Sequence, residues 1–334
     1  MDPHRTYANV DARLLEDLRK AGHRRIALQV PAGLLPMAPS LALQIAEATG
    51  ATIVTPTRAC FGGCDPPSPE ETLGAEAIVT LGHAPILNMT EPVPEYYVEM
   101  RTETGDVERL AEIVVARGLP RKLGLVASVQ HLDLLSPLIA ALAKKGVTGL
   151  VGVGGKRLAY PGQALGCNYT TATTLEKDVE GFLFLGTGRF HPIGLSLSVA
   201  VPIWSLDPLQ ASLEGPYDRQ KMINQRLLLV ESAMDAKRWG VLVSTFPGQM
   251  RRALAQRLVD KAFEHGKEAF LLTFDRLDGR DLVGRKMDAY VITACPRIAI
   301  DDASLYDRPM LTAPEFLSAI GDRPLTPYLF DTYV

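Results

Sequence analysis

Short apolar runs alternate with helical patterns along this 334-residue chain, and the alternation restarts twice, giving three similar rounds. Parallel strands need long crossovers, usually helices, so this order predicts an α/β protein with parallel sheets. The expected strands are residues 26–30, 52–54, 77–81, 123–127, 149–153, 182–185, 201–206, 239–244, 269–272 and 288–292. The expected helices are residues 10–21, 41–50, 107–116, 132–145, 218–236 and 249–264.

The three rounds predict three similar domains, each a small parallel sheet flanked by helices. The expected boundaries are 1–118, 119–236 and 237–334, with a linker at 118–122. Only the order of elements repeats, because residue-level repetition is not evident. The segment Ser68-Pro69-Glu70-Glu71 is a capping box that predicts a further helix before the strand at 77–81.

Composition narrows the class of protein and its partners. Hydrophobic residues make up 47% of the chain, and 35 basic residues against 38 acidic ones give a net charge of -3. This balance excludes a global electrostatic field for nucleic acid. No signal-peptide core and no long apolar run is present, so we expect a cytoplasmic protein that does not enter a membrane. Disulfides are not expected in that compartment.

Four cysteines lie in three distant segments, at Cys60 and Cys64, at Cys167, and at Cys295. Each segment follows an apolar run and is rich in Gly or Pro, so three loops after strands are expected to converge on one site. Thiolates favour zinc or iron-sulfur clusters, and a 4Fe-4S cluster with three cysteines leaves one iron open. Buried thiols that only fill the core are the alternative.

The pair Cys60 and Cys64 has the C-x-x-x-C spacing that begins the local three-cysteine motif of many radical S-adenosylmethionine enzymes. Pro67 stands where that motif requires its third cysteine. The local motif is therefore excluded, and the remaining ligands of any cluster must come from the distant loops.

Three segments resemble those of a known family, the archaeal diphthamide synthases. They are Phe61-Gly62-Gly63-Cys64-Asp65, the loop at 162–169 that contains Cys167, and Ala294-Cys295-Pro296-Arg297 with the residues up to Asp302. Further similar segments are Pro31-Ala32-Gly33-Leu34-Leu35, Gly82-His83, Gly188-Arg189-Phe190-His191-Pro192 and Gly248-Gln249. The resemblance runs in order from about residue 26 to the C-terminus.

The resemblance implies three domains around a central iron-sulfur site, with Cys64, Cys167 and Cys295 as ligands of one 4Fe-4S cluster. Cys60 falls outside the family's ligand position and is expected to be a packed or rim thiol. The implied enzyme is a noncanonical radical transferase. It moves a 3-amino-3-carboxypropyl group from S-adenosylmethionine to imidazole C2 of a histidine in translation elongation factor 2. A homodimer and an external electron donor are also implied.

Four residues are expected to contact S-adenosylmethionine. Arg297 is expected to pair with its carboxylate, although a salt bridge to Asp301 or Asp302 is an equal alternative. Gln249 is expected to open a helix and face a polar ligand, with helix capping as its alternative. Pro31 and Gly33 form a strand-to-helix turn that brings backbone close to the cofactor, or is simply a tight turn.

The segment at 186–192 follows a strand, but its spacing is not a dinucleotide fingerprint and no helix is expected to open on it. His191 is expected to be structural, and no catalytic residue is assigned. The enzymatic rival is quinolinate synthase, which resembles this pattern in its three-cysteine cluster within three α/β domains. A zinc-stabilised scaffold that uses the three cysteines and His83 or His191 is the non-catalytic rival.

Overall fold

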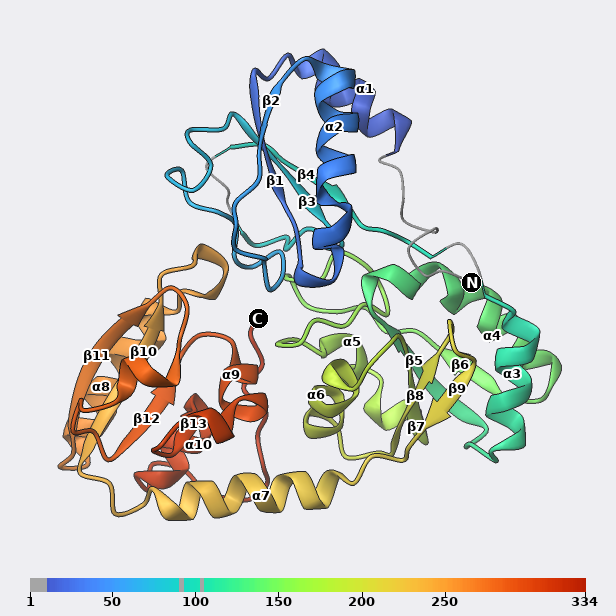
Figure 1. Cartoon of the computed structure of the whole chain (residues 1–334). Helices are drawn as coiled ribbons and strands as arrows, with labels where there is room; N and C mark the ends of the chain where they lie inside the picture. Colours follow the sequence, from blue (N-terminus) through green and yellow to red (C-terminus); the bar gives the residue numbers. More distant parts are fainter. Residues whose placement is uncertain (1–10, 90–92, 103–104) are drawn as a thin grey trace.

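The computed structural model describes residues 11–89, 93–102 and 105–334, and its strands form three separate sheets around a common centre (Figure 1). The predicted α/β class is confirmed, with three small parallel sheets flanked by helices. Among the described residues, no helix is both long and apolar enough to cross a membrane.

The first sheet lies at the top of Figure 1 and has the parallel strand order β2-β1-β3-β4. Its strands are β1 (Arg25–Gln29), β2 (Thr52–Val54), β3 (Ala77–Leu81) and β4 (Glu95–Val98), and its helices are α1 (Ala12–Ala21) and α2 (Ala38–Thr49). The Asp11 carboxylate accepts from the Arg13 N–H at the start of α1, and Gly22 ends the helix at a φ of 69°. The expected start of this helix at Val10 lies outside the described residues.

The predicted helix after Ser68 is wrong, although its capping contacts form. The Glu71 N–H donates to Ser68 Oγ at 3.2 Å, and the Ser68 N–H donates to Glu71 Oε2 at 2.9 Å. Only turns follow, because Leu73 and Gly74 both adopt positive φ and stop the chain after one turn. Glu71 also binds the Arg58 guanidinium, so this turn supports the loop that carries Cys64.

The second sheet, on the right of Figure 1, has the order β6-β5-β7-β8-β9, in which only β9 is antiparallel. Its strands are β5 (Lys122–Ala127), β6 (Thr148–Leu150), β7 (Gly181–Leu185), β8 (Ile203–Asp207) and β9 (Ser212–Glu214). The helices beside it are α3 (Val107–Ala116), α4 (Leu135–Lys144), α5 (Thr170–Thr173) and α6 (Phe190–Ser198). Helix α6 corrects the expectation that no helix opens on the 186–192 segment. It begins at Phe190, and Pro192 fits in its first turn because an N–H there has no partner within the helix.

Helix α3 falls within the range predicted for the first domain, but it packs on the second sheet. Leu110, Ala111 and Val114 on its inner face are buried in the same core as residues of β5, β7 and α4. This packing favours a boundary ahead of Val107. The boundaries at 118 and 236 otherwise stay predictions.

The third sheet, on the left of Figure 1, has the parallel order β11-β10-β12-β13. Its strands are β10 (Arg238–Ser244), β11 (Glu268–Phe274), β12 (Ala289–Ile292) and β13 (Met310–Thr312), with helices α8 (Arg252–Glu264), α9 (Pro296–Asp301) and α10 (Ala313–Ala319). Helix α7 (Arg219–Ser232) runs from the second sheet to the third, with Ile223 buried in one core and Val230 in the other.

Each sheet places its first strand between its second and third, so the same topology occurs three times. The loops after the carboxyl ends of these strands face the centre of the molecule. Such ends are where open α/β sheets carry their ligand sites.

Candidate functional site

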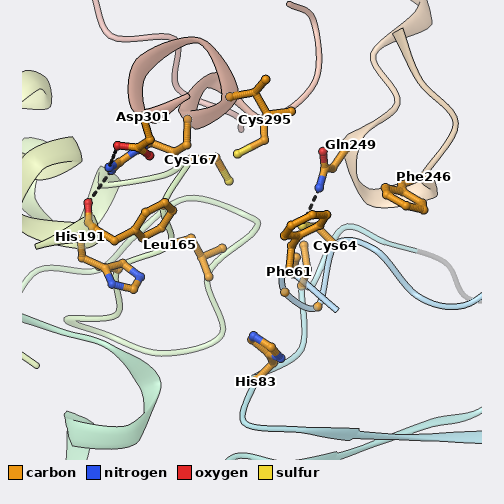
Figure 2. Close-up of a pocket in the computed structure, with 18 of the residues that line it drawn as sticks. Phe61, Cys64, His83, Leu165, Cys167, His191, Phe246, Gln249, Cys295 and Asp301 are labelled. Carbon is orange, nitrogen blue, oxygen red and sulfur yellow. Dashed lines mark hydrogen bonds and ion pairs between the residues drawn. The ribbon is translucent and has the colours of Figure 1, made fainter. Parts of the chain in front are cut away.

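A cavity of about 590 Å³ lies where the loops of the three sheets meet, and Cys64, Cys167 and Cys295 all line it (Figure 2). Residues that follow five of the strands contribute to its wall: His83 after β3, Ser128 after β5, Phe190 after β7, Phe246 after β10 and Arg276 after β11. The volume is typical of a site for a small molecule or cofactor.

The Cys64 loop is folded around the carboxylate of Asp65. Asp65 is fully buried and accepts the backbone N–H groups of Phe61 and Gly62 at 2.9–3.0 Å. Arg58 donates to the same carboxylate at 2.9 Å, and its guanidinium lies 4.7 Å from the ring centroid of Phe246. Because a loop held by its own backbone donors has little freedom, Cys64 is presented to the cavity in a fixed position.

Cys167 lies in a tight turn between Leu165 and Asn168, whose backbone N–H and C=O groups exchange two hydrogen bonds of 3.0 Å. Gly166 precedes it, and a Cβ at Gly166 would lie 2.3 Å from the ring of Phe190. Glycine is therefore required there by the close approach of an aromatic side chain.

Cys295 is the residue that caps the amino end of α9, two residues after Thr293 leaves the third sheet. Burial raises its pKa to about 12, and a hydrogen bond from the backbone N–H of Arg297 partly opposes this rise. The short helix thus turns the Cys295 side chain toward the cavity, on the same side as Cys167 in Figure 2.

The three thiols share one electrostatic environment. Burial raises the pKa of Cys64, and the neighbouring thiolates of Cys167 and Cys295 raise it further. Burial also raises the pKa of Cys167, while the guanidiniums of Arg157 and Arg251 lower it. Buried thiols that repel one another as thiolates are stabilised by a bound cationic metal centre, which is the chemistry of a cluster site.

Within residues 11–89, 93–102 and 105–334, no three His, Cys, Asp or Glu side chains are arranged to hold a single metal ion. The cysteines of a cluster bind separate irons, so they need not meet at one point. His83 and His191, the additional ligands of the zinc hypothesis, both line the cavity. Burial lowers the pKa of each to about 4, so both rings are neutral.

Gln249 lines the cavity from a short 3-10 turn, Pro247–Gln249, ahead of α8. The helix begins at Arg252, so Gln249 does not open it as expected. Its Nε2 instead donates to Cys64 Sγ at 3.3 Å, which links the third sheet to the Cys64 loop (Figure 2).

Arg297 lines the cavity but is engaged by protein groups. Its Nε and Nη2 donate to Asp301 at 2.7 Å, and its Nη1 donates to Phe190 O at 2.6 Å and to Tyr169 Oη at 3.3 Å. The alternative of a salt bridge to Asp301 is therefore formed. Four of the five guanidinium donors are used, so a bidentate pair with a substrate carboxylate requires Asp301 to give way.

Pro31 and Gly33 do not line the cavity. Pro31 follows β1 and pairs with Cys60 in a bridge, and Gly33 is exposed in a 3-10 turn. Their contact with S-adenosylmethionine stays a prediction. Cys60 also lies away from the cavity, is 6% exposed, and has a pKa raised to about 12 by burial.

Several residues that surround the cysteines were not predicted from the sequence. Arg157, Arg251 and Tyr333 lie behind the Cys167 loop, and the Tyr333 N–H donates to Cys167 O at 2.8 Å. The position of Arg157 in a glycine-rich loop ten residues before Cys167 was a usable signal. No sequence signal pointed to Tyr333, because its contact partners are distant in sequence.

Comparison with known proteins agrees with this geometry. The family model for diphthamide synthesis proteins matches residues 30–329. The chain belongs to the diphthamide synthesis family. A 2-(3-amino-3-carboxypropyl)histidine synthase of Pyrococcus horikoshii is 34% identical over 312 residues, which cover 93% of this chain and 90% of the relative. Subunit 1 of the human synthase is 28% identical, with 95% of this chain and 73% of the relative covered.

A solved structure in the diphthamide synthesis family has the same fold. The crystal structure of Dph2 from Pyrococcus horikoshii with a 4Fe-4S cluster matches with a TM-score of 0.87 and 33% identity. The match covers 96% of this chain and 92% of that one. The resemblance found in the sequence is thus confirmed, and membership in this family favours it over the quinolinate synthase and zinc-scaffold alternatives.

Proposed function

We propose that this chain is a 2-(3-amino-3-carboxypropyl)histidine synthase that carries out the first step of diphthamide biosynthesis. It transfers the 3-amino-3-carboxypropyl group from S-adenosylmethionine to imidazole C2 of a histidine in translation elongation factor 2. The observation that carries this proposal is the convergence of Cys64, Cys167 and Cys295 from three different sheets on one cavity.

The donor set fits a 4Fe-4S cluster. Three soft thiolates from Cys64, Cys167 and Cys295 would hold three irons and leave the fourth open. When bound and reduced, the cluster supplies one electron that cleaves the bond between sulfur and the methionine γ-carbon, which gives methylthioadenosine and a 3-amino-3-carboxypropyl radical. An imidazole carbon is a poor nucleophile, so a carbon radical is a route that needs no strong base.

The chain's own residues contribute binding, orientation and exclusion of water. Phe190 and Phe246 give the wall apolar surface, and the neutral rings of His83 and His191 add no charge that would repel a cationic sulfonium. In our proposal Gln249 and Arg297 hold the polar methionine end of S-adenosylmethionine. Pro31 and Gly33 lie outside the cavity wall, so their turn supports the site from behind Gly82, which lines the cavity. Holding the substrate in one orientation is the main way a protein assists cofactor chemistry.

The partners in this proposal follow from the reaction. Elongation factor 2 is the protein substrate, an electron donor reduces the cluster, and the chain acts as a homodimer in the cytoplasm. Neither nucleic acid nor a membrane takes part. All three ligand cysteines come from a single chain, which fits a dimer of identical subunits.

An anaerobic assay tests the proposal. The reconstituted protein is incubated with dithionite, S-adenosylmethionine and archaeal elongation factor 2, and the products are read by mass spectrometry. We expect methylthioadenosine and one aminocarboxypropyl adduct on a single histidine. Formation of 5′-deoxyadenosine, or no cleavage by a fully loaded protein, would contradict the proposed reaction.

A further inference from the structure

The C-terminal residues lie at the centre of the molecule, against the loops that carry the pocket cysteines (Figure 1). The Tyr333 N–H donates to Cys167 O at 2.8 Å, and Asn168 Nδ2 donates to Tyr333 O at 2.9 Å. The tail is therefore bonded to the backbone of Cys167 and to the side chain of the next residue, Asn168.

Two arginines pack on the ring of Tyr333. The Cζ atom of Arg157 lies 3.9 Å from the ring centroid, and that of Arg251 lies 4.7 Å from it. Arg251 makes a bidentate ion pair with Asp331 at 2.7–2.8 Å and donates to Ala294 O beside Cys295. Arg157 donates to Gly248 O at 3.0 Å, which is the carbonyl next to Gln249 in the third sheet's loop.

Arg157 differs from the other buried arginines in its charge balance. Arg226 pairs with Glu315 and Arg297 pairs with Asp301. Arg157 is 2% exposed, and among the described residues its Nε has no hydrogen-bond partner and its guanidinium has no carboxylate partner. A cation buried without an opposite charge is unfavourable, so this position indicates an anionic group that the protein side chains do not provide.

That group is expected next to Cys167. The Arg157 guanidinium packs on the ring of Tyr333, and the Tyr333 N–H donates to Cys167 O, so this cation lies beside the Cys167 loop. A 4Fe-4S core of charge two plus held by three thiolates carries one net negative charge, and one electron adds a second. A nearby fixed cation stabilises the reduced form more than the oxidised form.

We propose that Arg157, packed on Tyr333, is the buried counter-cation of the cluster and makes its reduction easier. This inference rests on the proposed function, because it requires the cluster to be bound by Cys64, Cys167 and Cys295. Arg157 is a positioning and tuning residue in this proposal and does not touch the substrate.

The test is the one-electron midpoint potential of the loaded protein, measured by anaerobic titration with dithionite and dye mediators and read by electron paramagnetic resonance. For Arg157→Gln we expect the ratio of reduced to oxidised cluster at a fixed potential to fall at least tenfold, a shift of about 59 mV to more negative values. Arg157→Lys keeps the charge and should keep most of the wild-type potential. Asp331→Asn removes a negative charge and should shift the potential in the opposite direction.

Arg238→Gln is the control, since Arg238 is an exposed cation at the amino end of β10 and the cavity lies beyond the carboxyl ends. It should leave the potential unchanged. The thermal stabilisation gained on loading the cluster gives a second measurement, and it should be smaller in Arg157→Gln than in the wild type. If Arg157→Gln does not fold, two other variants test the inference. Arg157→Met should shift the midpoint potential to more negative values, and Asp331→Asn should shift it to more positive values.

Two results would overturn the inference while leaving the proposed function intact. One is a loaded Arg157→Gln protein with the wild-type potential, and the other is an Arg157→Lys protein that shifts as far as Arg157→Gln. A wild-type protein that binds iron at none of the three cysteines would instead refute the proposed cofactor, and the inference with it. Visible absorbance and iron content distinguish these cases before any potential is measured.

Discussion

At the residue scale, local hydrogen bonding decides which thiols face the cavity. Asp65 accepts two backbone N–H groups and so fixes the Cys64 loop, and a tight turn fixes Cys167. Cys60 lies only four residues before Cys64, but its N–H donates to Val30 O and its side chain is buried beside β1. The two cysteines of the C-x-x-x-C pair therefore have different environments.

Single alanine substitutions at the four cysteines separate ligands from packing residues. We expect Cys64→Ala, Cys167→Ala and Cys295→Ala each to lose the brown colour and most of the iron after anaerobic reconstitution, because a cluster held by two thiolates is not retained. Cys60→Ala should keep both and serves as the matched control. The measurements are iron content and visible absorbance, and full colour in any of the first three variants would contradict the assignment.

Gln249 offers a second test at this scale. Gln249→Ala removes the amide that reaches Cys64, and we expect the affinity of the loaded protein for S-adenosylmethionine to fall roughly tenfold, as for loss of one hydrogen bond. Gln256→Ala, on the exposed side of α8, is the control and should bind normally. Equilibrium dialysis measures both, and equal affinities would remove Gln249 from the proposed binding site.

At the element scale, one buried ion pair joins α7 to α10. Arg226 donates to both carboxylate oxygens of Glu315 at 2.7–2.8 Å, and Glu315 also accepts the Thr312 N–H in a capping box at the start of α10. Burial opposes ionisation of Glu315, but the Arg226 bonds prevail and lower its pKa. A carboxylate whose pKa is lowered by folding stabilises the folded state when the pH is above the ordinary pKa of that group. This contribution is lost as the pH falls through the pKa that the group has in the folded state.

Glu315→Gln should lower the free energy of unfolding by about 3 kcal/mol at neutral pH, because it leaves the Arg226 charge buried without its partner. The gap between wild type and variant should shrink as the pH falls from the ordinary pKa of a glutamate to the lowered pKa of folded Glu315, because over that range the unfolded wild-type chain takes up a proton that the folded protein does not. Glu264→Gln breaks an exposed pair with Lys261 and should change stability by less than about 0.5 kcal/mol. Urea unfolding at several pH values measures both, and a gap independent of pH would contradict the account of Glu315.

At the scale of the whole molecule, the cavity exists only because the three sheets close on one another. One close approach is at Gly248, where an added Cβ would lie 2.5 Å from Cys64 O and 2.6 Å from Cys64 Cα. Arg276 also crosses from the third sheet to the first, where it donates to Ala59 O and lies over the ring of Phe61. These contacts set the distance between the Cys64 loop and the loops of the third sheet.

Gly248→Ala should separate the first and third sheets at the cavity. We expect a loss of about 1–3 kcal/mol in stability, as for other overpacked sites, together with lower iron content after reconstitution. Gly155→Ala is the control, because a methyl group there meets only ordinary contacts with Thr170. Thermal unfolding and iron analysis measure both variants, and normal loading of Gly248→Ala would show that the approach at this glycine is not needed.

The sequence by itself determined the class of fold, because the alternation of strand and helix patterns is a local property of the chain. Residue type and strand-end position also placed the four cysteines in three candidate loops, and the family resemblance implied Cys64, Cys167 and Cys295 as the ligands. Short elements such as β4, β13 and α9 were missed because three to six residues carry too little periodicity.

Only the tertiary structure decided the partners of the side chains. In the folded molecule α3 packs on the second sheet, Arg297 pairs with Asp301, and Arg157 is buried beside Tyr333. Each of these contacts joins different parts of the fold or selects one partner among several. Tyr333 and Cys167 are separated by most of two predicted domains, so no local pattern encodes their contact. Arg157 suggests a bound anion because it is buried without a carboxylate partner, and that burial exists only in the folded molecule.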